Sequence, residues 1–405
     1  MQQVLWGKVQ QQNNGNRIAI ALSGGGSRAM AFHLGCLRAL HQVGILQRCE
    51  TLSCVSGGSV LGAMYVTHQG SFASFEANVR AQLSQGFTRQ TIATAFTTSE
   101  GLKAILSTLI LISYRLLYLC LLPIVWTIRL GAQFLGNVSI RPAESISPRR
   151  FASRTTVLER TFDQNLFNRK AMKDLDGVVP KFVAVATELR TGTAFYFTPG
   201  ESGCWRFGKV NPDRIKIARA VAASAAYPLF LPALDEVFEF NRNDGSARRD
   251  RVTLTDGGVY DNLGLSPLWP DRNPSIGVDI PKPNIVIACR AGYGLRFGRP
   301  TNSLATRMAA SFYTSFDRSQ NAALKRLFDL KKAGKLQAIV LPYIGQADDR
   351  LANAPTDLIR REDVADYPTN FGPMTEDWIE KLSKRGEQVT LAVLRQHNPE
   401  LIFQQ

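Results

Sequence analysis

The segment TLSCVSGGSVLGA contains the residue types that an acyl-transfer nucleophile requires. Ser56 follows Val55 and precedes Gly57 and Gly58. A serine that attacks an ester lies in a sharp strand-to-helix turn, where larger neighbours would collide with the backbone. Cys54 occupies the position at which the usual Gly-x-Ser-x-Gly pattern has glycine. The segment predicts a nucleophilic Ser56, and the alternative is a serine that only caps the next helix.

A second segment, IAIALSGGGSRAMAFHLGCL, places Gly24, Gly25 and Gly26 in a turn between an expected strand and an expected helix. Glycines let a backbone approach a ligand closely and direct N–H groups at a negative charge beside a helix N-terminus. Arg28 adds a cation to the same turn. The pattern indicates a site for an oxyanion or a lipid phosphate, and the alternative is a plain tight turn.

The same glycines also fit a dinucleotide-binding pattern. Gly24, Gly26 and Ala29 match Gly-x-Gly-x-x-Ala, and Glu50 follows at a distance suited to an acid that binds a ribose. This match stands alone and leaves a nucleotide site open as an alternative. It gives no reason for a serine flanked by glycines on the following strand-to-helix turn.

A third segment, VTLTDGGVYDNLG, places Asp256 at the end of an expected strand, before Gly257 and Gly258. The carboxyl ends of strands are where α/β sheets place their ligands. The alternative is an ordinary turn. A carboxylate with a pKa of about 4 is a poor base for a serine hydroxyl unless burial raises its pKa. We expect a dry, apolar site to do so.

The distribution of histidine favours a Ser–Asp dyad over a Ser–Asp–His triad. The chain has only four histidines: His33, His41, His68 and His397. A triad in the α/β-hydrolase order needs a histidine after the aspartate. Only His397 follows Asp256, and it is expected at the exposed end of the last helix. We expect His33 to be a packed residue and His41 a surface residue.

Apolar, β-branched runs predict buried strands that alternate with helices. Such alternation predicts a three-layer α/β/α fold with a mainly parallel sheet and helices on both faces. The helix after the glycine turn is expected over Ala29 to Val43. The strands are expected at 17–22, 50–55, 181–187, 252–255, 284–289 and 336–341.

Taken together, the three segments resemble the patatin-like phospholipase family. In that family a glycine-rich oxyanion loop, a Gly-x-Ser-x-Gly serine and an Asp-Gly-Gly or Asp-Gly-Ala aspartate occur in this order. Two softer matches are VATELRTGTAFYF at 185–197, similar to a strand pair of the family, and AVAASAAYPLFLP at 220–232, similar to its Ala-Ser-x-x-x-Pro helix end. The resemblance covers roughly 17–80 and 180–270, whereas 85–150 and 345–405 lie outside it.

The resemblance implies an enzyme that cleaves carboxylic esters of membrane glycerolipids through an acyl-enzyme. Ser56 would be the nucleophile and Asp256 the base. The loop of Gly24, Gly25 and Gly26 would hold the oxyanion or the head-group phosphate together with Arg28. No metal or organic cofactor is implied. The alternative is a membrane-associated α/β module that binds a nucleotide or lipid without hydrolysing it.

We expect one hydrolase domain over 1–405 with an insertion at 85–150. Within the insertion, residues 104–128 contain one charge, Arg115, and one proline, Pro123. As a helix, 25 residues would span about 37 Å, against about 30 Å for a bilayer core. One crossing would leave Ser56 and Asp256 on opposite sides of the membrane. A shallow hairpin or two in-plane helices is therefore expected, and the alternative is a buried helix pair that forms a lid.

The charge balance favours an anionic partner. The chain has 48 basic and 33 acidic residues, a formal net charge of +15. With the resemblance, this predicts an anionic membrane surface and phospholipid substrate rather than nucleic acid; no oligomeric state is predicted. After the apolar stretch, only Glu144 opposes five arginines, which favours anionic lipid: Arg129, Arg141, Arg149, Arg150 and Arg154.

Cysteine usage and the first residues predict a cytoplasmic protein held at the membrane peripherally or monotopically. Six scattered cysteines form neither a CxxC pair nor a disulfide scaffold, which indicates a reducing compartment. Residues 1–16 contain no basic start followed by an apolar run, so no signal peptide is expected. The cysteines are Cys36, Cys49, Cys54, Cys120, Cys204 and Cys289.

Overall fold

The computed structural model describes residues 15–134, 152–228, 230–242, 244–273, 278–292, 303–352 and 354–402. The strands are β1 Ile18–Leu22, β2 Cys49–Val55, β3 Lys181–Glu188, β4 Thr193–Phe197, β5 Ser202–Cys204, β6 Gly208–Val210, β7 Leu234–Asn241, β8 Ala247–Asp256, β9 Ile285–Cys289 and β10 Ala338–Val340. The α-helices are α1 Gly26–Gln42, α2 Gly57–Thr67, α3 Phe72–Gln85, α4 Phe87–Thr97, α5 Ser99–Phe134, α6 Arg154–Asn165, α7 Ile217–Ser224, α8 Gly258–Asp261, α9 Leu304–Lys332, α10 Glu362–Ala365 and α11 Glu376–His397.

The sheet combines a parallel half with an antiparallel half. Its strand order is β10-β9-β1-β2-β3-β4-β5-β6-β7-β8. The pairs from β10 to β3 are parallel, and those from β3 to β8 are antiparallel. The α/β fold is confirmed, but the sheet is mixed rather than mainly parallel. The difference arises because the short strands β4 to β6 and the polar strand β7 lack the long apolar runs from which strands were predicted.

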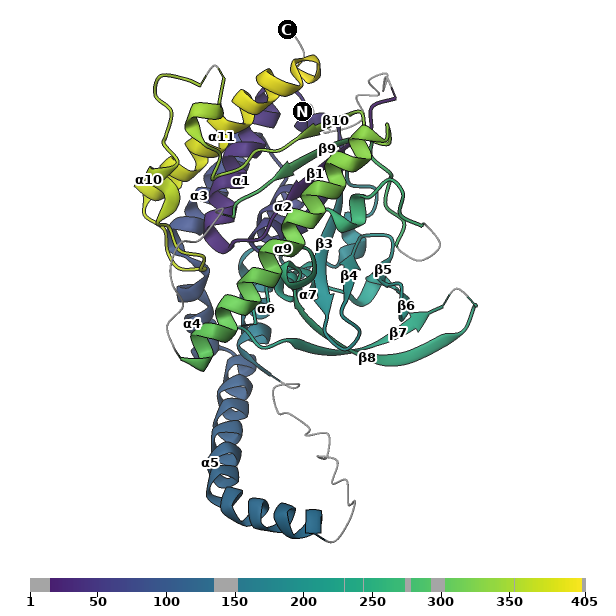
Figure 1. The fold of residues 1–405 in the computed structure, drawn as a ribbon, viewed down its shortest axis with the longest axis vertical. Helices are drawn as coiled ribbons and strands as arrows, with labels where there is room; N and C mark the ends of the chain where they lie inside the picture. The colour runs from purple at the N-terminus through teal and green to yellow at the C-terminus, as the bar shows by residue number, and fades with distance from the viewer. Residues whose placement is uncertain are drawn as a thin grey trace, which may run out of the picture.

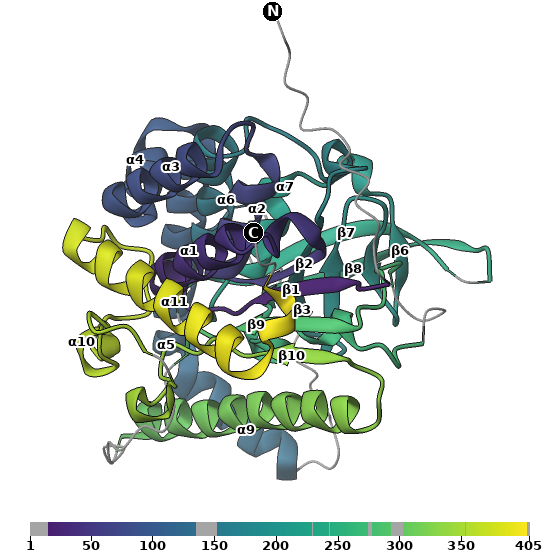
Figure 2. The same cartoon turned by 90° about the horizontal axis from the view of Figure 1, so that it is seen from above.

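Helices cover both faces of the sheet, which gives the three layers. Side chains of a strand alternate between its faces, and in β1 the isoleucines and leucine pack on one core while the alanines pack on the other. The first core also contains residues of α1, α2, α3, α6, α7 and α11. The second is closed by Leu327 and Leu330 of the long helix α9. Figure 2 shows α9 and α11 running along different sides of the sheet.

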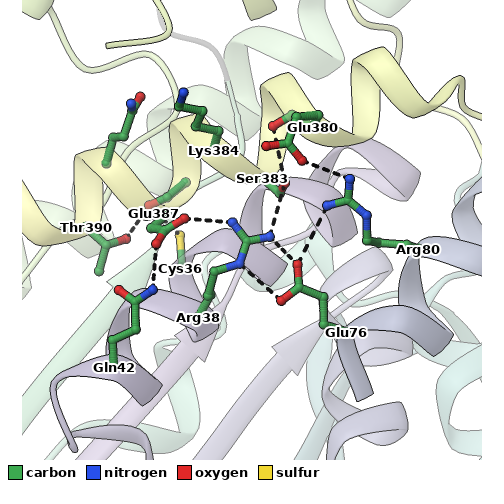
Figure 3. A network of polar contacts seen from close by, with 12 residues as sticks. Cys36, Arg38, Gln42, Glu76, Arg80, Glu380, Ser383, Lys384, Glu387 and Thr390 are labelled. Carbon is green, nitrogen blue, oxygen red and sulfur yellow. Dashed lines mark hydrogen bonds and ion pairs between the residues drawn. The ribbon is translucent and has the colours of Figure 1, made fainter. Parts of the chain in front are cut away.

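The C-terminal helix α11 is held against α1 and α3 by a network of charged side chains (Figure 3). Arg38 of α1 binds Glu76 of α3, and its Nη1 lies 2.7 Å from Glu387 of α11. Arg80 of α3 contacts Glu380 of α11 at 2.8 Å. These ion pairs are partly exposed, so each contributes little free energy. The chain that precedes α11 borders the cavity described below.

Helix α5 departs from the rest of the molecule. It is one helix of 36 residues with Pro123 inside it, and Figure 1 shows it projecting from the body and bending near its far end. A proline inside a helix removes a backbone hydrogen bond and causes such bends. Among the described residues, the span Ser99–Ile124 has the length and hydropathy needed to cross a membrane, and 6% of its most apolar window is buried.

Both expectations for 104–128 are wrong for the residues that the structure describes. A hairpin or two in-plane helices was expected, but the helix runs without a break from Ser99 to Phe134. The buried helix pair is also excluded because most of the apolar side chains are exposed. Arg141, Arg149 and Arg150 lie outside the described residues, as do residues 1–14, so the arguments about their charge and about a signal peptide are not tested there.

The two ends of this excursion meet at one place on the body. Ala104, near the base of α5, Ala152, where the described chain resumes, and Val157 of α6 are buried in one small apolar cluster. The chain therefore leaves and re-enters the body at the same place.

Candidate active site

Ser56 occupies the turn between β2 and α2 in a strained conformation. Its φ is 51° and its ψ is −120°, a region that residues with a side chain rarely adopt and that clusters at functional sites. Its residue exposure is only 6%. Gly57 allows this turn, because a Cβ there would lie 2.1 Å from the carbonyl oxygen of Gly26. The glycine loop and the serine turn are thus packed backbone against backbone.

Ser56 and Asp256 converge because two strands end against the same edge of β3. Parallel strand β2 pairs Val55 with Val185. Antiparallel strand β8 arrives from the opposite direction and pairs Asp256 with Ala186. Two strand ends that face adjacent residues of β3 must bring their next side chains together. This brings the Ser56 side chain beside the carboxyl group of Asp256.

Burial dominates the electrostatics of Asp256. It raises the pKa of Asp256 to about 6, while the hydrogen bond from the Gly258 backbone and the neighbouring Ser56 side chain oppose the rise. The Gly258 N–H donates to Asp256 Oδ1 at 2.7 Å. The expected effect of a dry site on this carboxyl group is therefore present. A carboxylate with a pKa of about 6 is a much better proton acceptor than one in water and is still mostly ionised at pH 7.

The three glycines of the loop have different backbone roles. The Gly24 N–H donates to the Asn262 carbonyl at 3.0 Å, so this donor is already occupied. Among the described residues, the N–H groups of Gly25 and Gly26 have no protein acceptor. Gly25 has a φ of 147°, which glycine tolerates and other residues do not. That the loop holds an oxyanion or a head-group phosphate stays a prediction, in which the N–H groups of Gly25 and Gly26 are the available donors.

Arg28 lies in the first turn of α1 beside these donors. Its side chain is 9% exposed, and it borders the cavity that contains Ser56. Its Nε donates to the Ala291 carbonyl and its Nη1 to the Tyr367 carbonyl, each at 3.2 Å. These bonds fix the guanidinium group beside the glycine loop.

The sequence analysis gave no role to Ser224, which supports the serine turn. Its hydroxyl accepts a hydrogen bond from the Ser56 N–H at 3.0 Å and donates one to the Val185 carbonyl at 2.6 Å. It also lies 2.8 Å from the hydroxyl of Ser59, which is fully buried. The Ala-Ser-x-x-x-Pro match pointed to Ser224, but the sequence did not say which turn this serine would support.

Cys54 is accommodated by a glycine elsewhere in the same turn. It is fully buried, and a Cβ at Gly62 of α2 would lie 2.4 Å from its sulfur. The missing glycine of the usual pattern is therefore compensated across the strand–helix contact. The departure from the pattern does not prevent the turn from forming.

The structure gives histidine no place beside the carboxyl group of Asp256. None of the described residues that border the cavity is a histidine. His397 ends α11 and is exposed, as expected. His33 is fully buried, with Nε2 3.1 Å from the Cys289 carbonyl, and burial lowers its pKa to about 3. His33 is thus a packed, neutral residue.

The position of Glu50 argues against the dinucleotide alternative. Glu50 lies at the start of β2, whereas the glycine loop follows the end of the parallel strand β1. Five strand residues, about 16 Å, separate these two edges of the sheet. An acid that binds a ribose would need to lie near the glycine loop, at the end of β2. Ser56 occupies that end instead.

Ser56, Asp256, Gly24, Gly25, Gly26 and Arg28 all border one cavity of about 1220 Å³. Its walls are largely apolar and come from α4, α5, α6, α9 and the segment after α7. The base of α5 contributes Ala104, Ile105 and Leu109. Such a cavity is large enough for long acyl chains. The described residues contain no group of three or more metal-binding side chains that could hold an ion.

Comparisons with known proteins bear on the fold and the family of this chain. Human GIVD cytosolic phospholipase A2 is similar in structure, with a TM-score of 0.52 at 13% identity over 93% of this chain and 58% of that chain. VipD from Legionella pneumophila gives a TM-score of 0.40 at 14% identity over 94% of this chain and 67% of that chain. The chain spans little more than half of the human enzyme and about two thirds of VipD. No curated protein was found to match the chain in sequence.

The family model described as patatin-like phospholipase matches residues 20–269, which is more than half of the chain. The match includes the glycine loop, the serine turn and the Asp-Gly-Gly segment in the order that the sequence analysis used. The chain therefore belongs to the patatin-like phospholipase family.

Proposed function

We propose that the protein is a serine lipid acyl hydrolase of the phospholipase A or lysophospholipase type, acting on carboxylic esters of membrane glycerolipids. The observation that carries this proposal is the position of Ser56 beside a buried carboxyl group, that of Asp256, in a large apolar cavity. Membership of the patatin-like phospholipase family supports lipid ester hydrolysis.

In the first half of the proposed reaction, the Ser56 oxygen attacks the ester carbonyl carbon while its proton passes to Asp256. The negative charge that forms on the carbonyl oxygen is stabilised by the N–H groups of Gly25 and Gly26 and by the N-terminus of α2. Asp256 then gives its proton to the leaving alcohol oxygen as the ester C–O bond breaks. This leaves an acyl-enzyme on Ser56.

In the second half, water attacks the acyl-enzyme and Asp256 takes its proton. The Ser56 oxygen leaves and is reprotonated by Asp256, and the fatty acid is released. No metal or organic cofactor takes part in these steps. Gly24 serves by allowing the loop to lie close to Asn262, and Arg28 is placed to bind a negatively charged part of the substrate.

We further propose that the protein acts from the cytoplasmic surface of a membrane, with α5 inserted into the bilayer as an anchor. The exposed side chains of α5 are mostly apolar, and a soluble surface rarely exposes so large a continuous apolar patch. Because the chain leaves and re-enters the body at Ala104 and Ala152, the body stays on one face of the bilayer. The apolar residues with exposed side chains are Leu102, Leu106, Leu109, Ile110, Ile112, Tyr114, Leu116, Leu117, Tyr118, Leu119, Leu121, Leu122, Ile124 and Trp126.

This arrangement gives a lipid a continuous apolar path to Ser56. Ile105 and Leu109 border the cavity, and Leu109 also belongs to the exposed apolar surface of α5. An acyl chain could therefore leave the bilayer along α5 without crossing water, which avoids the cost of exposing its CH₂ groups, about 0.8 kcal/mol each.

The test is covalent labelling combined with lipid analysis. A serine-directed fluorophosphonate should label Ser56, identified by peptide mass spectrometry, because only an activated serine reacts. Mixing the purified protein with liposomes should release fatty acid and lysophospholipid, measured by mass spectrometry. A module that only binds a lipid or nucleotide would give neither label nor products, and that result would refute the proposal.

A further inference from the structure

Three arginines from distant parts of the chain place positive charge near Tyr343. Arg290 follows β9 and its guanidinium carbon lies 4.8 Å from the centre of the Tyr343 ring. Arg28 and Arg361 border the cavity itself. Burial raises the pKa of Tyr343, and the positive charges of Arg290, Arg361 and Arg28 oppose that rise. We call these four residues the arginine cluster.

Two members of the cluster, Arg290 and Arg361, carry charge that the described part of the protein does not neutralise. Among the described residues, neither Arg290 nor Arg361 forms an ion pair with a carboxylate. The Nε of Arg290 and the hydroxyl of Tyr343 are buried without a hydrogen-bond partner there. The carboxylate of Asp317 is also near Tyr343 and borders the cavity. It supplies one negative charge against the three positive charges of the arginines. Buried donors without partners next to a cavity indicate a site for an anion.

Arg385, in the same region, is a buried arginine whose side-chain donors have acceptors within the protein. Its side chain is wholly buried, Nη1 binds Asp348 at 2.6 Å, and Nε, Nη1 and Nη2 donate to backbone carbonyls. Arg290 and Arg361 have no such set of acceptors in the described residues. The difference separates an arginine that fixes the fold from arginines left available for a ligand.

The sheet places the cluster at a useful distance from Ser56. Tyr343 and Arg290 pair in a parallel bridge beyond the ends of β10 and β9, on the edge where β1 ends at the glycine loop and β2 ends at Ser56. Adjacent strands lie about 4.8 Å apart. The ends of β9 and β10 are therefore roughly 10–15 Å from Ser56, with Arg28 between them. This matches a phospholipid lying along the edge, its ester at Ser56 and its head group at the cluster.

We propose that the arginine cluster is a head-group subsite that selects phospholipids with a net negative head group over zwitterionic ones. This inference rests on the proposed hydrolase function. Arg290, Tyr343 and Arg361 all lie beyond residues 20–269, so the subsite is supplied by the C-terminal part of the chain rather than by the segment that matches the family. A choline or other cationic group would be repelled there, whereas a phosphate or other anion would be bound by several guanidinium donors.

The experiment compares monomeric short-chain lipids, which removes the effect of a charged membrane surface. Dihexanoyl phosphatidylglycerol and dihexanoyl phosphatidylcholine are offered below their micelle concentrations, and the ratio of their kcat/KM values is measured. We expect the wild type to prefer the anionic lipid by about tenfold. Arg361→Gln should lower the ratio several-fold, and Arg290→Gln with Arg361→Gln should bring it close to one. The fraction of folded protein cancels in this ratio.

Arg360→Gln is the matched control. Arg360 is the neighbour of Arg361, but it pairs with Glu362 at 3.0 Å and does not border the cavity. Its removal changes the net charge equally and should leave the ratio at the wild-type value. A wild-type ratio near one, or a ratio that the two cluster variants do not change, would overturn the head-group subsite. Failure to hydrolyse both lipids and 4-nitrophenyl butyrate would instead refute the hydrolase function.

Inorganic phosphate distinguishes the other source of the same chemistry. If the cluster binds a head group, millimolar phosphate should only compete with the anionic lipid, and the preference should be seen without it. If the cluster binds free phosphate as a regulator, phosphate should change the rate on 4-nitrophenyl butyrate through Arg361 while the lipid ratio stays near one. The second result would overturn the proposal.

Discussion

The turn that holds Ser56 and the helix α5 differ in how far the rest of the protein covers their side chains. Around Ser56, the turn is held in place by other parts of the same protein. The strained serine is held by β3, Ser224 and the glycine loop, and it is 6% exposed. In α5, by contrast, Leu116, Leu117 and Leu119 are 59%, 58% and 62% exposed. The first region is packed on all sides, whereas the second has apolar side chains that the described residues do not cover.

The comparison teaches where each kind of information comes from. A strained turn persists only when the surrounding structure holds it in place. The serine turn therefore indicates a functional site that the fold itself positions. A long apolar helix that is exposed indicates a surface that binds a membrane or another protein. The two regions meet at Ile105 and Leu109, which border the cavity at the base of α5. Four predictions test whether they are separate in function.

The largest effect is expected from Ser56→Ala. Loss of the attacking oxygen should lower ester hydrolysis on the order of 10⁴-fold or more and abolish fluorophosphonate labelling. Binding to liposomes should not change, because α5 is untouched. Hydrolysis of 4-nitrophenyl butyrate and sedimentation with liposomes measure the two properties. Ser59→Ala is the matched control, since Ser59 is buried near the same turn. A larger loss of hydrolysis in this variant would mean that Ser56 is not the nucleophile.

Asp256→Asn should lower kcat/KM by about 10²- to 10⁴-fold, because the amide keeps the shape but cannot accept the serine proton. In the wild type, kcat/KM should fall as the pH drops below about 6, since Asp256 becomes protonated there. The pH profile of the residual activity in the variant should lack this limb. A wild-type profile that is flat down to pH 4.5 would contradict the role of Asp256 as base.

Stability supplies the control for this variant. Because the pKa of Asp256 is raised from 3.8 to about 6 on folding, the folded protein binds the proton more tightly than the unfolded chain. The free energy of unfolding should therefore fall as the pH rises through that window, by up to about 3 kcal/mol. Asp256→Asn should remove this loss and be at least as stable as the wild type at pH 8. A destabilised variant would mean that its inactivity reflects misfolding.

For α5, the combination Leu116→Glu, Leu117→Glu and Leu119→Glu should weaken binding to liposomes on the order of a hundredfold, because leucines that insert into a bilayer are replaced by charges. Hydrolysis of 4-nitrophenyl butyrate should continue. The matched control places the same three charges on exposed positions of α3, with Ala73→Glu, Asn78→Glu and Gln85→Glu. Liposome sedimentation equal to the wild type in the α5 variant would refute membrane docking.

The smallest effect is expected from Gly62→Ala, which sharpens the account of the serine turn. The added methyl group would meet the sulfur of Cys54, and we expect a loss of about 1–3 kcal/mol in the free energy of unfolding. Cys54→Gly restores the usual pattern and should rescue Gly62→Ala in a double-mutant cycle measured by denaturant unfolding. Additive effects of the two changes would show that Cys54 and Gly62 do not compensate each other.

Local sequence patterns determined the turns and the buried strands of this protein. The six predicted strands correspond to β1, β2, β3, β8, β9 and β10, because apolar, β-branched runs favour buried strands whatever their neighbours. The resemblance also anticipated β4, but β5, β6 and β7 were missed. β7, with the sequence LDEVFEFN, is polar enough to resemble a surface loop, and only its pairing with β8 makes it a strand.

Only the tertiary structure decided which distant residues meet. Ser56 and Asp256 converge because β2 and β8 end on adjacent residues of β3, and such a register depends on pairings between residues far apart in the chain. The direction of α5 is another such case, since its composition fits a hairpin, a lid or a free helix equally well. The arginine cluster is a third. Local patterns record backbone preference and hydrophobicity, whereas Arg28, Arg290 and Arg361 approach one another only when the whole sheet and its C-terminal cover are assembled.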